Sequence, residues 1–112
     1  LYISVDYSQK ISVPLKAFGA WTEETNIFNY LGVHYVDLIH YMTGWLPVRA
    51  NATAMSKRLI ASGLRTPDSI HASVVWRNPS DAEDLLYSHF NINWIDPDCG
   101  SAVSDQKFIV VG

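Results

Sequence analysis

The alternation of hydrophobic and polar residues predicts five β-strands. A period of two runs through residues 1–7, 48–55, 70–76 and 87–94, and a short apolar run covers residues 107–111. This alternation is typical of strands with one buried face. Turn-forming residues separate the segments, most clearly at Asn78-Pro79-Ser80-Asp81 and at Asp96-Pro97-Asp98-Cys99-Gly100. The sequence therefore predicts about five strands joined mostly by short loops.

Between the first two strands the spacing of apolar residues changes to that of a helix. Thr22 or Thr25 is a suitable N-terminal cap, and the helical period is clear from Ile27 onward. Gly44, followed by Pro47 three residues later, is typical of the C-terminal end of a helix. We expect an α+β fold: an open antiparallel or mixed sheet with one long helix packed on one face.

The predicted helix has a polar stripe beside an apolar one. At about 100° per residue, Tyr30, His34, Asp37 and Tyr41 share a band roughly 60° wide. Leu31, Tyr35, Leu38 and Met42 form the adjacent stripe that packs on the sheet. An imidazole three residues from a carboxylate can be oriented for proton transfer near neutral pH. His34 is therefore the candidate proton carrier. The alternative is that His34 and Asp37 only hydrogen-bond each other at the helix surface and have no catalytic role.

The second face of the sheet is predicted to be polar. Its residues are Asn51, Thr53, His71, Ser73, His89, Asn91 and Asn93. Such a face can contact water, a ligand or another subunit. His71 and His89 lie on neighbouring strands but lack an obvious third metal ligand, so we predict no metal site. Trp94 alternates with Phe90 and Ile92, which favours a core position over one that stacks on a bound ligand.

Composition limits the classes of protein that remain. The chain has 112 residues, of which 48% are hydrophobic, and this fits one folded domain. Its net charge of −3 indicates that it has no basic surface for binding nucleic acid. It has no membrane-length apolar run and no signal-peptide pattern, and its single cysteine fits a reducing compartment, so we expect a soluble cytoplasmic protein. No G-x-G-x-x-G or phosphate-loop pattern is present. The lack of an initiator methionine suggests a piece of a longer chain.

The segment from Asn26 to Gly44 resembles the signature helix of the glucose-fructose oxidoreductase/inositol dehydrogenase (Gfo/Idh/MocA) family. The family's Gly-x-His-x-x-Asp run is matched by Gly32, His34 and Asp37. The stretches Asn93-Trp94-Ile95-Asp96-Pro97 and Ser104-Asp105-Gln106-Lys107 are similar to one subgroup of that family.

The resemblance implies that residues 1–112 are the truncated C-terminal substrate-binding and oligomerisation domain of a two-domain oxidoreductase. An N-terminal Rossmann domain outside this chain would bind NAD or NADP, and the family's catalytic lysine would lie there too. The substrate would be a sugar, polyol or sugar acid, and the fragment alone would be inactive. A homo-oligomer would form through the open sheet face. The alternatives are a sheet-mediated oligomerisation module and a non-catalytic module that binds a small ligand.

The same resemblance assigns roles to individual residues. His34 would be the general acid/base, and Tyr30 stands where many relatives carry an aspartate. A phenol there can hydrogen-bond substrate but carries no charge at neutral pH, given a reference pKa of about 10. Asp37, together with Tyr7 and Gln9 at the end of the first strand, would contact substrate.

Overall fold

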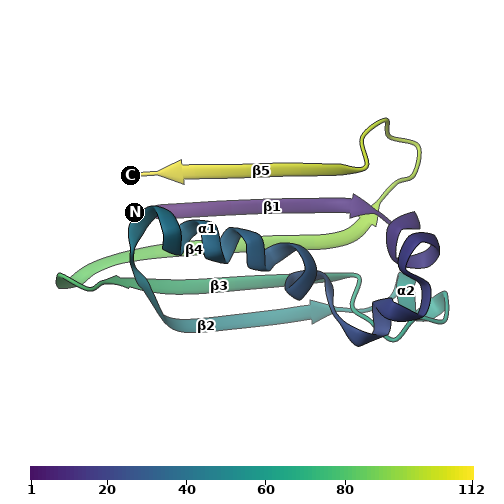
Figure 1. The fold of residues 1–112 in the computed structure, drawn as a ribbon, viewed down its shortest axis with the longest axis horizontal. Helices are drawn as coiled ribbons and strands as arrows, with labels where there is room; N and C mark the ends of the chain where they lie inside the picture. Colours follow the sequence, from purple (N-terminus) through teal and green to yellow (C-terminus); the bar gives the residue numbers. More distant parts are fainter.

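The computed structural model describes residues 1–112 and contains a five-stranded sheet (Figure 1). Its strands are β1 (Tyr2–Lys10), β2 (Leu46–Met55), β3 (Ser69–Asn78), β4 (Asp81–Asp96) and β5 (Ser104–Val111). The strand order is β2-β3-β4-β1-β5. β1 pairs with β4 in parallel, and all other neighbours are antiparallel. The five predicted strands and the mixed sheet are confirmed.

The structure does not contain the single long helix that the sequence predicts. It has instead a series of short segments: the π-helix η1 (Val13–Phe18), the 3-10 helix η2 (Gly19–Glu24), the π-helix η3 (Phe28–Gly32), and the α-helices α1 (Val33–Thr43) and α2 (Arg58–Ala61). The predicted C-terminal end is confirmed, because Gly44 has a φ of 69° and donates its N–H to the His40 carbonyl at 2.7 Å. No helix in the structure has the length and apolar character needed to cross a membrane.

The predicted caps also differ from the observed ones. Thr22 lies inside η2, where its hydroxyl donates to the Pro14 carbonyl at 3.0 Å, and Thr25 has an extended backbone. Asn26 has the capping role instead, since its side-chain oxygen accepts the N–H of Asn29 at 2.9 Å. The observed capping residue, Asn26, is therefore one position after Thr25, the later of the two predicted caps.

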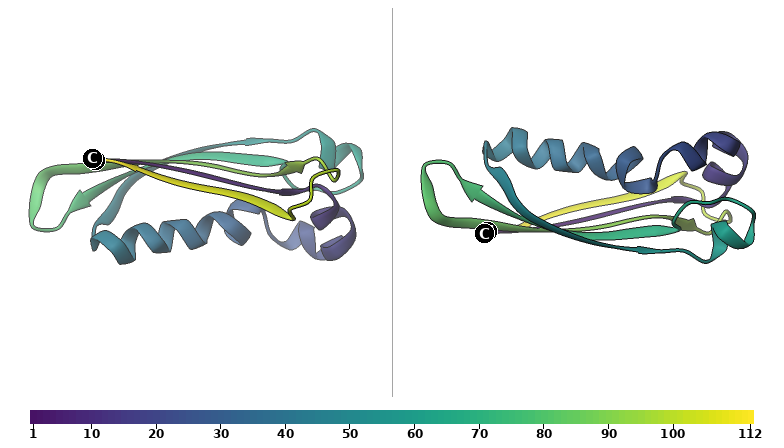
Figure 2. Two further views of the ribbon diagram at one scale, coloured as in Figure 1. Left: turned by 90° about the horizontal axis from the view of Figure 1, so that it is seen from above. Right: turned by 90° about the horizontal axis from the view of Figure 1, so that it is seen from below.

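α1 and the three η segments lie on one face of the sheet and leave much of the other face uncovered (Figure 2). The core lies between α1 and the sheet. Its fully buried side chains include Ile39 from α1, Trp76 from β3 and Phe90 from β4. Trp94 has no exposed surface, so the prediction of a core position is confirmed. The buried indole N–H of Trp76 is satisfied by Ser88 Oγ at 2.8 Å.

Candidate functional site

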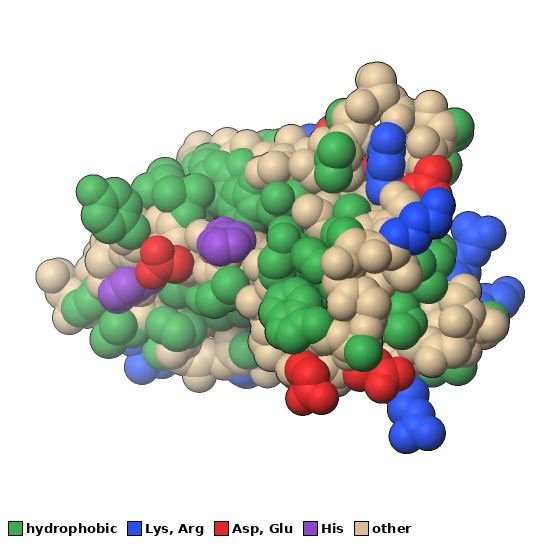
Figure 3. Space-filling view, turned by 45° about the vertical axis from the view of Figure 1, so that its right-hand side comes forward, with side chains coloured by type: hydrophobic (Ala, Val, Ile, Leu, Met, Phe, Trp, Pro, Cys, Tyr) green, Lys and Arg blue, Asp and Glu red, His purple; other side chains and the backbone are tan.

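The outer surface of α1 carries His34 and Asp37. Ile39 faces the sheet and is fully buried, whereas both polar residues are exposed. At about 100° per residue, His34 lies roughly 140° and Asp37 roughly 160° from Ile39, in opposite senses around the helix. Histidine and acidic side chains are visible on this face among hydrophobic ones (Figure 3). The imidazole of His34 is therefore accessible to a molecule that binds on the outer surface of α1.

No hydrogen bond or ion pair joins His34 to Asp37. Neither ring nitrogen of His34 is bonded within the chain, so both are free for a ligand. Asp37 lines a shallow hollow of about 340 Å³ between α1 and β2, together with His40, Leu46 and Trp76. In that hollow the Nδ1–H of His40 donates to the Trp45 carbonyl at 2.8 Å, which leaves its Nε2 as the free acceptor.

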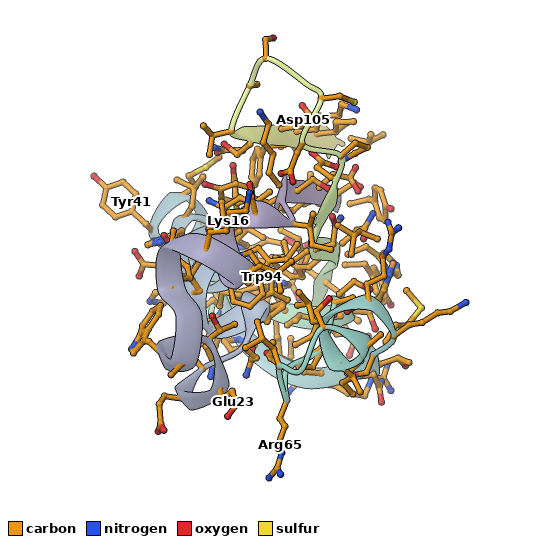
Figure 4. All side chains as sticks on the ribbon, turned by 90° about the vertical axis from the view of Figure 1, so that its right-hand side faces the viewer. Lys16, Glu23, Tyr41, Arg65, Trp94 and Asp105 are labelled. Atoms are coloured by element: carbon orange, nitrogen blue, oxygen red, sulfur yellow. The ribbon has the colours of Figure 1, made fainter.

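Tyr30 and Gln9 are brought together by the buried ring of Trp94. The ring centroids of Tyr30 and Trp94 are 6.2 Å apart, and the Trp94 indole N–H donates to Gln9 Oε1 at 3.1 Å. Figure 4 shows Trp94 in the interior behind the η segments. The hydroxyl of Tyr30 makes no hydrogen bond within the chain, and Tyr30 is half-buried. Tyr30 therefore does not continue the exposed stripe, because η3 has a wider turn than an α-helix.

Tyr7 lies in a second contact group between α1 and the β1–β5 pair. Its ring meets that of Tyr35 edge-on at 5.8 Å, and Tyr35 stacks on Phe108 at 5.8 Å. The Tyr35 hydroxyl donates to Gln106 Oε1 at 2.7 Å. Burial raises the pKa of the Tyr35 phenol above its ordinary value of 10.0, and the neighbouring Tyr7 raises it further.

The structure thus arranges the five predicted site residues along one side of the molecule in three places. His34 and Asp37 are on the outer surface of α1, Tyr30 and Gln9 share Trp94, and Tyr7 packs on Tyr35. No single closed cavity contains all five. Trp21 is not among the residues predicted from the sequence; it is an exposed indole whose ring lies 6.0 Å from that of Tyr30. The sequence feature that could have indicated Trp21 is its position outside any periodic apolar pattern.

The uncovered face of the sheet has the polar character that the sequence predicts. The strand registers place Asn51, Ser73, His89 and Ser4 in one row across four strands, and Thr53, His71, Asn91 and Asp6 in the next. These residues line a shallow hollow of about 240 Å³ apart from Asp6, which accepts a hydrogen bond from Asn91 at 3.1 Å. No three histidine, cysteine, aspartate or glutamate side chains lie close enough together to hold a metal ion.

Neither a family model nor a curated protein matches this sequence. One solved structure, described as that of a putative oxidoreductase from Thermotoga maritima, is similar to the chain with a TM-score of 0.76 and 17% sequence identity. The match covers 99% of this chain and 32% of that chain, so the present chain spans about a third of the length of the protein it matches. At this identity the similarity shows a shared fold, which in the Thermotoga maritima protein is part of a longer chain.

Proposed function

We propose that this chain is the substrate-binding domain of an oxidoreductase that transfers hydride between a nicotinamide cofactor and a sugar, polyol or sugar acid. The observation that carries the proposal is the exposed imidazole of His34, whose ring nitrogens are free, four residues after Tyr30 on a helix packed against the sheet. The fold shared with a protein described as an oxidoreductase supports it, as does the resemblance of residues 26–44 to the Gfo/Idh/MocA signature helix.

This chain alone does not fit a dinucleotide cofactor. Phosphates are commonly bound by free N–H groups at a helix N-terminus that follows a glycine-rich turn. Here the first three N–H groups at α2 are taken by the Asp68 carboxylate at 2.8–2.9 Å, and the start of the η3–α1 segment is capped by Asn26. The cofactor, NAD or NADP, would therefore be bound by a separate Rossmann domain, and this chain would only bind the substrate and transfer the proton.

Within the proposal, His34 takes the proton from the substrate hydroxyl during oxidation and returns it during reduction. The free hydroxyl of Tyr30 hydrogen-bonds a neighbouring substrate hydroxyl and stays uncharged at neutral pH. Asp37 accepts a hydrogen bond from substrate. Gln9 offers its side-chain N–H2 group, since its oxygen is already bonded to Trp94. Tyr7 offers its phenol from β1, on the helix-covered face.

Turnover of the full-length protein tests this function directly. The protein is assayed with NAD and with NADP on a panel of aldoses, polyols and uronic acids. His34→Asn is expected to lower kcat by about 10²-fold or more, the usual effect of losing a general acid/base. The matched control is His40→Asn, which changes the same residue type six positions further along α1. Absence of turnover on the whole panel contradicts the function, and unchanged turnover in His34→Asn removes that residue from the mechanism.

A second candidate function is self-association through the uncovered sheet face. The observation that favours it is the continuous polar surface across β2, β3, β4 and β1, centred on Asn51, Ser73 and His89. A two-fold interface brings the same patch of two subunits together, so one substitution acts twice.

Sedimentation across a range of concentrations tests this association. Asn51→Arg introduces like charges into the proposed interface and is expected to produce monomers. The control Met42→Arg lies on the exposed side of α1 and should leave association unchanged. A wild-type protein that stays monomeric at high concentration contradicts this candidate.

A further inference from the structure

Trp21 holds a large apolar ring at the surface. It is 49% exposed, whereas Trp76 and Trp94 are completely buried. Leaving an indole in water forgoes the free energy that its burial would provide, so an exposed and ordered tryptophan often marks a contact surface. Trp21 is outside the hydrophobic core cluster, which contains Trp94 with Phe18 packed against it.

The segment that carries Trp21 is fixed on both sides. The next residue, Thr22, is fully buried and donates to the Pro14 carbonyl at 3.0 Å. Glu23 accepts the backbone N–H of Arg65 at 2.9 Å, which ties η2 to the loop after α2; Glu23 and Arg65 are labelled at this end of the molecule in Figure 4. A ligand that stacks on Trp21 would therefore order little additional protein on binding.

The ring of Trp21 is also fixed in orientation. Phe18 meets it edge-on at 5.0 Å and an interplanar angle of 87°, and Tyr30 meets it edge-on at 6.0 Å and 83°. Both contacts are T-shaped, and 49% of the residue stays exposed, so part of the indole remains open to a ligand. Tyr30 in turn stands four residues before His34, and η3 continues directly into α1 between them. Trp21, Tyr30 and His34 therefore follow one another from η2 to α1.

We propose that Trp21 is a stacking platform for the ring of a cyclic sugar whose reacting carbon lies at His34. This inference rests on the proposed function, which supplies the sugar. A pyranose presents a flat face of C–H groups that packs on an indole, while its hydroxyls remain free for Tyr30 and His34. An acyclic polyol has no such face. Trp21 thus selects ring-form sugars over open-chain polyols.

Binding of two matched ligands to the full-length protein tests the platform. The probes are methyl β-glucopyranoside, which is locked as a ring, and glucitol, an acyclic polyol with the same six-carbon chain as the glucose unit. Trp21→Ala is expected to weaken pyranoside binding by about 5- to 10-fold, the scale of one aromatic contact, and glucitol binding by less than about twofold. Trp21→Phe, which keeps a ring, should restore part of the pyranoside affinity.

The control is Tyr41→Ala, which removes another exposed aromatic ring, 85% exposed, near the far end of α1. It should change neither affinity. The platform is contradicted if the wild-type protein binds no pyranoside, or if Trp21→Ala weakens both ligands equally or neither.

The platform and the proposed reaction can fail separately. Pyranoside binding that depends on Trp21 in a protein without turnover supports the platform and contradicts the oxidoreductase. Turnover that depends on His34 but has the same KM for ring sugars in Trp21→Ala contradicts the platform and leaves the reaction in place.

Discussion

The phenol of Tyr35 donates a 2.7 Å hydrogen bond to Gln106 Oε1, and this contact joins α1 to the edge strand β5. Phe108, two residues along β5, stacks on the same ring at an interplanar angle of 17°. Tyr7, the β1 residue opposite Gln106, meets the ring edge-on. Because Tyr35 directly follows His34, this group also fixes the helix that presents the proposed proton carrier.

Tyr35→Phe should therefore weaken the attachment of α1. The substitution keeps the ring contacts with Phe108 and Tyr7 and removes only the hydrogen bond, whose net contribution is about 1 kcal/mol. We expect the free energy of unfolding, measured by urea titration, to fall by that amount. Tyr41→Phe is the control, since Tyr41 lies on the same helix and makes no hydrogen bond through its hydroxyl. Equal stability of Tyr35→Phe and the wild-type protein would show that Gln106 is equally well satisfied by water.

The raised pKa of Tyr35 predicts a loss of stability at high pH. The unfolded chain releases the phenol proton near the ordinary value of 10.0, whereas the folded chain holds it to a higher pH. Between these two values the folded state binds more protons, so the free energy of unfolding falls as pH rises, and below the lower value this group adds no pH dependence.

The measurement compares urea unfolding of three proteins. Between about pH 8 and about pH 11, Tyr35→Phe should lose less stability than the wild-type protein, while Tyr41→Phe should follow the wild type. A slope that is the same in all three proteins would mean that Tyr35 titrates alike in the folded and unfolded states.

The strands could be predicted from the sequence because the two sheet faces have different surroundings. Along β4, for example, Phe90, Ile92 and Trp94 face the helix and are buried, while His89 and Asn91 face the other side. Ser88 breaks this rule, since it is polar, faces the helix and is fully buried. Its partner Trp76 explains the exception, but only the β3–β4 register brings the two together.

The helix and the site could be predicted only in part. The exposure of His34 and Asp37 follows from their spacing to Ile39, because all three lie in regular α-helix. Tyr30 lies in η3, where the assumption of 100° per residue no longer holds. Trp21 is in a 3-10 segment without periodicity. The Tyr35–Gln106 contact depends on the pairing of β5 with β1, and no local pattern specifies that pairing.

Asp68 should be more important for stability than its loop position suggests. Its buried carboxylate accepts the N–H groups of Lys57, Arg58 and Leu59 at the start of α2. Asp68→Ala leaves these donors without their charged partner, so we expect thermal or urea unfolding to show a loss of about 2–3 kcal/mol. Asp105→Ala is the control and should cost less than about 0.5 kcal/mol, because its pair with Lys107 is largely exposed. Similar losses in both variants would contradict a special role for Asp68.

Gly32 should resist substitution by alanine even though its backbone is helical. Alanine inside a helix is normally favoured over glycine by about 1 kcal/mol. Here an added Cβ would lie 2.9 Å from the ring of Phe28, and that ring cannot move freely because it packs edge-on against Phe90 at 5.5 Å. We therefore expect Gly32→Ala to lower the free energy of unfolding by about 1–3 kcal/mol, the usual cost of overpacking.

A double-mutant cycle shows whether the Phe28 ring is the cause. In a Phe28→Leu background the flat ring is gone, so Gly32→Ala should cost much less than it does in the wild type. Gly100→Ala serves as the control, since its added Cβ would meet only the Pro97 carbonyl at 3.9 Å. If Gly32→Ala stabilises the protein instead, the Phe28 ring must shift easily, and the close packing between η3 and β4 does not hold the start of α1 in place.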